Sequence, residues 1–226
     1  MTDPVRRAGP VGGGLWVVAS VLVPNVYVLV LSVAVDRELG AAGLGRQSLI
    51  AFVSAAATTL AGAGGFVAVV RAIGAGLGSG DATAARRAAH WGLRLHVTTG
   101  VAAGVAVAAP VLWGVEPRAA WLLAALVTLL ATVQMLPMAV LVGAQRWRDA
   151  NVVGMVTGAV AVPASIAVLA AGGGIEGLFA VEAVVVTVNL VWTGLLARRA
   201  LAGPAGDTSI DHADHADHAD HADYAD

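Results

Sequence analysis

The chain has 226 residues, of which 58% are hydrophobic and 12% are charged, and its formal net charge is −2 at pH 7. Charged residues make up about a quarter of a typical soluble domain, so this composition excludes an ordinary soluble protein and leaves no length for a sizeable soluble catalytic domain. The sequence contains no cysteine, which excludes disulfides and thiolate metal sites.

Six apolar stretches follow one another along the chain, and each has about the 20 residues that an α-helix needs to cross a bilayer. The expected spans are 15–35, 48–70, 93–113, 119–142, 152–171 and 175–197. The first stretch follows a basic pair, as in a signal peptide. It is longer than the apolar core of a signal, and no A-x-A-like cleavage site follows it, so we expect a retained helix. The predicted fold class is all-α: a polytopic membrane protein with a bundle of about six transmembrane helices.

All the basic residues are arginines, and their distribution predicts the orientation of the protein. Arginine and lysine gather in the cytoplasmic loops of membrane proteins. With both termini in the cytosol, ten of the thirteen arginines lie inside, and only Arg37, Arg46 and Arg118 lie outside. We therefore predict a multi-pass protein of the bacterial inner (plasma) membrane with both termini cytoplasmic. Its expected parts are a cytoplasmic segment 1–14, a six-helix transmembrane domain 15–200 and a disordered tail 201–226.

The segments between the expected spans carry further signals. Residues 36–47 are expected to form the first external loop, and residues 71–96 the longest internal connection. In that connection Ser79-Gly80-Asp81 is typical of a turn and a helix start, and the basic residues after it predict an amphipathic helix on the membrane surface. The small residues at 61–65 predict close approach by a neighbouring helix. All six tryptophans fall near the ends of expected helices, as in the aromatic belt of membrane proteins.

Two charged residues inside or at the end of apolar stretches are candidates for function, because charge within a membrane is costly. Arg71 lies at the inner end of the second stretch, where it either snorkels to the headgroups or faces a cavity and attracts a diphosphate. Glu182 lies about seven residues into the last stretch. It is a candidate ion-coupling residue or a partner for an arginine, and it can equally remain a protonated structural residue.

Three amides interrupt the apolar stretches: Asn25, Gln134 and Asn189. They either bind the hydroxyl groups of a ligand in a wet cavity or, as is more usual, make contacts between helices worth about 0.6 kcal/mol each. Prolines in three stretches are compatible with the bent helices of transporters, although prolines are common in membrane helices.

A resemblance begins at Asp36-Arg37-x-Leu39-Gly40, followed by Gly43 and Gly45. This pattern resembles the "R-x-L-G-x-x-x-x-G" connection after the first helix of lipid-linked oligosaccharide flippases, the polysaccharide exporters of the larger family that contains the multidrug and toxic-compound extrusion proteins. Further matches follow in the family's order: Gly64-Gly65-Phe66 with Arg71, Gly80-Asp81, and Gly143-x-x-Arg146 with Asn151. Together they cover about residues 15–200.

The resemblance implies a transporter that moves a polyprenyl-diphosphate-linked sugar across the inner membrane for surface polysaccharide biosynthesis. It also implies a hydrophilic, cation-lined cavity between two halves, where the three amides would bind sugar hydroxyls, and polysaccharide assembly enzymes as partners. Arg37 and Arg46 either receive the glycan as it emerges or belong to a solvated interfacial loop. Family members have twelve to fourteen helices in two halves, and this chain matches the first half only. A homodimer, a separately encoded second half, and a truncated or frameshifted product are the alternatives.

Two other functions are compatible with the sequence. One is a membrane scaffold that recruits polysaccharide enzymes and transports nothing. The other is a divalent-cation transporter that uses the His-Ala-Asp repeats of residues 212–223 as a collector, although a repeat without a folded frame binds metal only loosely. No nucleotide, nucleophile or metal-protease motif is present, so we expect no enzymatic activity, no cofactor and no nucleic-acid partner.

Overall fold

The computed structural model describes the backbone of residues 10–202 and the side chains of Leu22 and residues 26–202. These residues form α1 (Pro10–Gly78), α2 (Ala82–Ala108), the 3-10 helix η1 (Ala109–Trp113), α3 (Arg118–Gly143), α4 (Trp147–Ala170) and α5 (Gly174–Ala202). The described part of the chain contains no strand, which confirms the all-α fold class. The expected segment 1–14 lies mostly outside these residues, and the tail after Ala202 lies wholly outside them.

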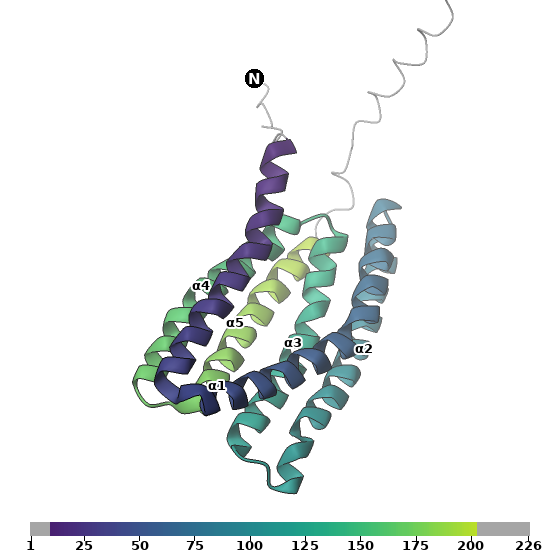
Figure 1. Ribbon diagram of the computed structural model, residues 1–226. Coiled ribbons are helices and arrows are strands. Elements are labelled where there is room, and N and C mark those ends of the chain that lie inside the picture. The colour runs from purple at the N-terminus through teal and green to yellow at the C-terminus, as the bar shows by residue number, and fades with distance from the viewer. Residues whose placement is uncertain (1–9, 203–226) are drawn as a thin grey trace, which may run out of the picture.

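The first two predicted spans lie on one helix, α1, so the described chain has five α-helices instead of six separate ones. At Gly40 the backbone leaves the helical conformation, with φ 69° and ψ 177°, and α1 turns back on itself (Figure 1). We call residues 10–39 its first limb and residues 41–78 its second limb. Only glycine adopts this backbone region readily, because it has no Cβ.

The prediction of an external loop over residues 36–47 is therefore wrong, since all of these residues except Gly40 are helical. Seven of its twelve residues are arginine, glutamate, leucine or alanine, which favour helix, and these outnumber its three glycines. The polar residues of 36–47 predicted a loop, and in the structure they surround the bend of a helix.

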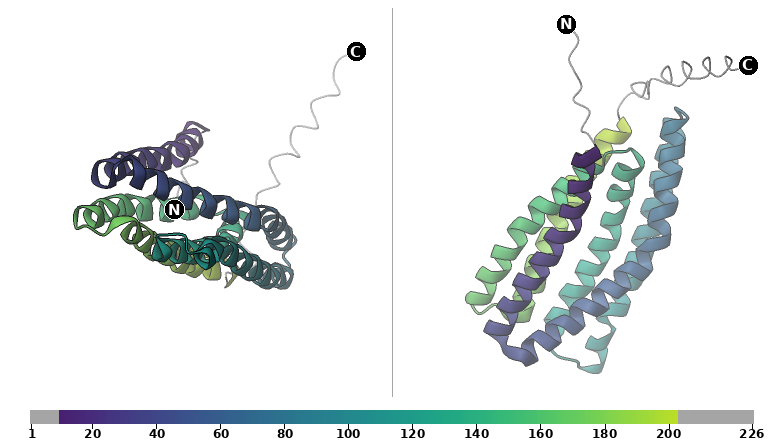
Figure 2. Two further views of the ribbon diagram at one scale, coloured as in Figure 1. Left: turned by 60° about the horizontal axis from the view of Figure 1, so that its bottom comes forward. Right: turned by 45° about the horizontal axis from the view of Figure 1, so that its top comes forward.

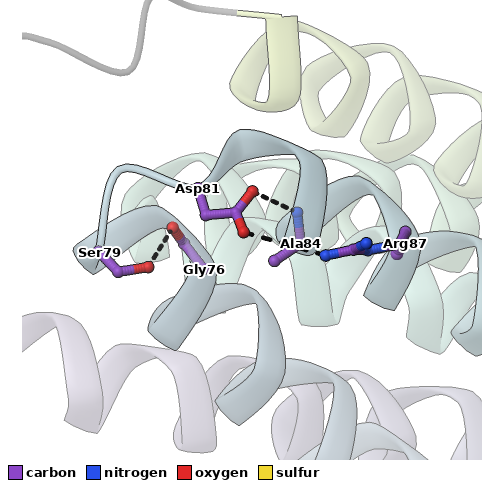
Figure 3. Close-up of polar contacts among 5 residues, drawn as sticks. All are labelled: Gly76, Ser79, Asp81, Ala84 and Arg87. Atoms are coloured by element: carbon purple, nitrogen blue, oxygen red, sulfur yellow. Dashed lines mark hydrogen bonds and ion pairs between the residues drawn. The ribbon is translucent and has the colours of Figure 1, made fainter.

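The connection between α1 and α2 contains only residues 79–81 (Figure 3). The Asp81 carboxylate accepts a hydrogen bond from the backbone N–H of Ala84 at 2.8 Å, and the Ser79 hydroxyl donates to the carbonyl of Gly76 at 3.1 Å. These contacts confirm the predicted turn and helix start, because a carboxylate at this position satisfies a free N–H of the first turn. The predicted separate surface helix is wrong: α2 runs without a break from Ala82 to Ala108.

Helices α2 and α3 and the second limb of α1 pack closely through glycines. Gly92, Gly100 and Gly104 are buried on one face of α2. A Cβ added to Gly104 would lie 3.0 Å from the carbonyl oxygen of Ala125 on α3. A Cβ on Gly65 would lie 2.8 Å from Leu95 Cδ2 of α2, which confirms the close approach predicted for residues 61–65. Glycines thus bring α2 against the backbone of α3, and the second limb of α1 against side chains of α2.

The chain segments alternate in direction between the two ends of the bundle. The bend of α1, the link between α2 and α3 and the turn between α4 and α5 lie at the lower end in Figure 1. The start of α1, its junction with α2, the turn between α3 and α4 and the end of α5 lie at the upper end. The first limb of α1 lies along α4, and the second limb crosses α3 and continues beside α2 (Figures 1 and 2).

The tryptophans are only partly at the surface. Trp91, Trp113 and Trp147 are exposed, as the predicted aromatic belt requires. Trp121 is 4% exposed and packs in a core cluster with Phe179 of α5, so it does not belong to a belt. The side chain of Trp16 lies outside the described residues.

Candidate functional site

A cavity of about 530 Å³ lies between both limbs of α1, helix α4 and helix α5. Small-molecule sites in proteins usually have about 300–1,000 Å³, so this volume suits a small ligand. Its walls are mainly aliphatic, with contributions such as Leu31, Val162 and Val185. Six side chains add polar atoms: Tyr27, Ser32, Gln47, Ser48, Ser165 and Glu182.

Each of the four helical segments supplies a polar side chain to this cavity. Tyr27 and Ser32 come from the first limb of α1, Gln47 and Ser48 from the second limb, Ser165 from α4 and Glu182 from α5. The Tyr27 ring lies against Gly158 of α4, where an added Cβ would be 2.8 Å from Cε2 of the ring. Gly158 therefore provides the space that lets the first limb reach α4.

The cavity lies nearer to the end of the bundle that holds the bend of α1. Glu182 is eight residues after the start of α5 at Gly174, which is about 12 Å along the helix. Gln47 and Ser48 follow the bend at Gly40 by two turns. The folding of α1 at one glycine is what brings Tyr27 and Gln47, twenty residues apart in sequence, into one wall.

The cavity contains one acidic side chain and no basic side chain among the described residues that line it. Among the described residues that line it, Glu182 is the only carboxylate and none is an arginine or a histidine. Glu182 is exposed to the cavity and takes part in no described ion pair. This cavity lies within one bundle, whereas the cation-lined cavity that the family resemblance implies lies between two halves.

The three candidate arginines lie at the surface and do not line this cavity. Arg71 is exposed near the end of α1, in keeping with a side chain that reaches to the headgroups. Arg46 is exposed in the second limb. Arg37 is also exposed, and with Glu38 and Ile166 it lines a second, smaller hollow of about 290 Å³ between the first limb of α1 and α4.

The candidate amides are not brought together. The side chain of Asn25 lies outside the described residues. Gln134 is half-buried on α3 and does not line the cavity. Asn189 donates from Nδ2 to the hydroxyl of Thr157 on α4 at 3.3 Å, while its buried Oδ1 has no hydrogen-bond partner among the described residues. For Asn189 the structure therefore favours a contact between helices.

Sequence reasoning missed His96, which is fully buried on α2. Its Nδ1 lies 2.8 Å from the carbonyl oxygen of Gly92, and because a carbonyl only accepts, Nδ1 carries the proton. Its buried Nε2 has no partner among the described residues and faces Gly65 of α1. The available signal was spacing, since His96 falls in a four-residue series with three glycines and so lies on the packed face of α2.

Metal binding receives no support from the part of the chain that the structure describes, which contains no cluster of three His, Asp or Glu side chains that could hold an ion. The His-Ala-Asp repeats lie outside the described residues.

Comparisons with protein-family models, with curated proteins and with solved structures find no match to the chain. The class of protein therefore rests on the fold and the site. In the described residues, five helices are long and apolar enough to cross a membrane. The chain is accordingly a multi-pass, all-α membrane protein, and a cavity with one acidic residue among its described lining lies between α1, α4 and α5.

Proposed function

We propose that the protein is a transporter of the bacterial inner membrane that moves a lipid-linked oligosaccharide from the inner to the outer leaflet for surface polysaccharide biosynthesis. The observation that carries the proposal is the cavity between α1, α4 and α5. Ionisable and polar side chains inside a membrane bundle are expensive, and they usually mark a substrate or ion pathway. Hydroxyl and amide groups on aliphatic walls suit a sugar, which has hydrogen-bonding edges and apolar ring faces.

The proposed topology has six crossings, with each limb of α1 crossing separately and both termini in the cytoplasm. The alternating directions of the segments support this arrangement (Figures 1 and 2). Seven described arginines lie within about two helical turns of the helix ends that Figure 1 shows at the top: Arg71, Arg86, Arg87, Arg146, Arg148, Arg198 and Arg199. Arg94 is twelve residues into α2. Three lie toward the other end: Arg37, Arg46 and Arg118. The positive-inside rule then makes the upper end cytoplasmic.

In this proposal the cavity holds the sugar, and the diphosphate remains outside it. The described lining has no basic side chain to pair with phosphate, whereas Arg37 and Arg46 are exposed near the bend of α1, at the same end as the cavity. A guanidinium at headgroup level binds phosphate in a bidentate manner. The lipid tail stays in the bilayer. A second copy of the chain, or a separate second half, completes the transport path, and polysaccharide assembly enzymes use the product.

The test is transfer by the purified full chain in liposomes that contain a fluorescent polyprenyl-diphosphate sugar. A glycosidase that cannot cross the membrane reports how much sugar has reached the outer leaflet. We expect faster transfer than in empty liposomes and a loss of rate in Glu182→Gln and Gln47→Ala. Glu176→Gln is the matched control, because Glu176 is an acid of the same helix that does not line the cavity.

A membrane scaffold predicts a different result. It would give no transfer, and polysaccharide export in cells would persist in Arg71→Ala and Glu182→Gln variants at normal protein levels. Transfer equal to that of empty liposomes, at protein densities that allow pairs to form, would contradict the proposed function.

A further inference from the structure

The cavity holds a lone carboxyl group, that of Glu182, whose role the proposed function does not explain. A carboxylate in surroundings of low polarity needs an opposite charge or several hydrogen bonds to offset its lost hydration. The described residues around Glu182 offer no arginine, lysine or histidine within the cavity wall. The three ion pairs of the described chain are all at exposed helix ends or links and leave Glu182 out.

The other features of the wall also suit a positive group. The ring of Tyr27 lines the cavity from the first limb of α1, and aromatic faces attract cations. The hydroxyl of Ser32 donates to the carbonyl of Val28 at 2.8 Å, which leaves its oxygen lone pairs free to accept. Carboxylate, hydroxyl oxygens and aromatic rings are all acceptors for an ammonium group.

We propose that the sugar bound in the cavity carries a free amino group, which pairs as an ammonium ion with the carboxylate of Glu182. This inference rests on the proposed function and narrows its substrate class to amino sugars. An ammonium supplies the missing opposite charge through a charge-assisted hydrogen bond. An acidic sugar would place a second carboxylate beside Glu182 without a cation between them, so the same site rejects it.

The experiment uses the full chain in nanodiscs of phosphatidylcholine, a lipid without net charge, and three octyl glycosides with the same tail. Their heads are 2-amino-2-deoxyglucose, 2-acetamido-2-deoxyglucose and glucuronic acid, at neutral pH. Binding is measured by isothermal titration calorimetry. We expect the amino head to bind at least tenfold more tightly than the acetamido head, and the glucuronide to bind more weakly than both.

Two variants distinguish binding in the cavity from a general attraction of cations to acidic side chains. Glu182→Gln keeps the size of the side chain and removes the charge, and it should remove the preference for the amino head. Glu176→Gln removes an equal charge from the same helix outside the cavity and should leave the preference unchanged. Equal binding of amino and acetamido heads to the unaltered chain would overturn this inference, and so would a preference that survives in Glu182→Gln. Equal binding of the two heads leaves the sugar site of the proposed function intact, whereas no binding of any of the three probes overturns both.

Discussion

The contact between α2 and α3 at Gly104 permits a quantitative test of the packing. Replacing Gly104 with alanine places a Cβ 3.0 Å from the carbonyl oxygen of Ala125. That oxygen belongs to the backbone of α3, so it cannot move aside as a side chain would. The helices must separate by a few tenths of an ångström, and overpacking of this kind costs about 1–3 kcal/mol.

The intrinsic preference of alanine for helix offsets part of this cost. Glycine is about 1 kcal/mol less favourable than alanine in a helix interior. Gly64→Ala makes the same chemical change in the interior of α1, where a Cβ meets nothing within 4 Å. Because the preference term is common to both variants, the difference between their free energies of unfolding isolates the contact. We expect Gly104→Ala to be less stable than Gly64→Ala by about 1–3 kcal/mol.

The measurement is the equilibrium unfolding of each purified variant in mixed micelles with increasing sodium dodecyl sulfate, followed by the loss of tryptophan fluorescence. Gly194→Ala, on α5, is a second control with open space around the added Cβ. If the variants at Gly104 and Gly64 unfold at the same detergent fraction, then α2 and α3 are not in backbone contact at this point and the packing argument is wrong.

Three further predictions address the bend, the turn and the cavity. Gly40→Ala should destabilise the protein by about 1–3 kcal/mol in the same unfolding assay, because alanine is strained at φ 69° and ψ 177°. Gly45→Ala, where the added Cβ meets nothing within 4 Å, should not destabilise it. Equal stability of the two variants would contradict the bend. Asp81→Ala should lower the free energy of unfolding by about 1 kcal/mol, because it removes the cap of α2, and Asp81→Asn should retain most of the stability. If both variants are as stable as the unaltered chain, the cap has no energetic role. A cysteine at Ser48, in the cavity wall, should react with a thiol reagent in this cysteine-free chain, and a cysteine at Thr128, which is fully buried, should not. Equal labelling of the two cysteines, measured by mass spectrometry, would contradict the placement of the cavity.

The sequence was sufficient for those features that depend on neighbours along the chain. Apolar runs predicted α3 within one residue at each end, since hydrocarbon length sets the length of a spanning helix. The turn at Ser79-Gly80-Asp81 was predictable because a cap bonds to a backbone N–H only three residues away. The small residues near position 65 predicted a close contact with a neighbouring helix, but they did not predict that this helix would be α2.

Features that depend on distant segments could not be predicted. Three glycines stand close together at 40, 43 and 45, and nothing in their local sequence says which one leaves the helix. Gln47 belonged to an expected loop and in fact lines the cavity, because its orientation is fixed by the bend at Gly40. Asn189 and Gln134 looked alike in sequence, yet only Asn189 meets a hydroxyl on a neighbouring helix. The two residues differ because each helix is rotated differently about its own axis, and the apolar composition of a helix does not determine that rotation.

The distribution of close contacts suggests where the bundle is rigid. Glycines bring the second limb of α1, α2 and α3 into contact at Gly65, Gly92 and Gly104. Among the described side chains of the first limb, Tyr27 lies against Gly158 of α4, and Val35 packs with Leu169 and Leu178. One wall of the cavity is therefore the first limb, whose boundary with the glycine-packed second limb is the single residue Gly40, and α4 and α5 complete the lining. A ligand site placed at such a boundary can change its width by rotation at Gly40 while the glycine contacts of α2 and α3 stay intact, which is the mechanical requirement for binding on one side of a membrane and release on the other.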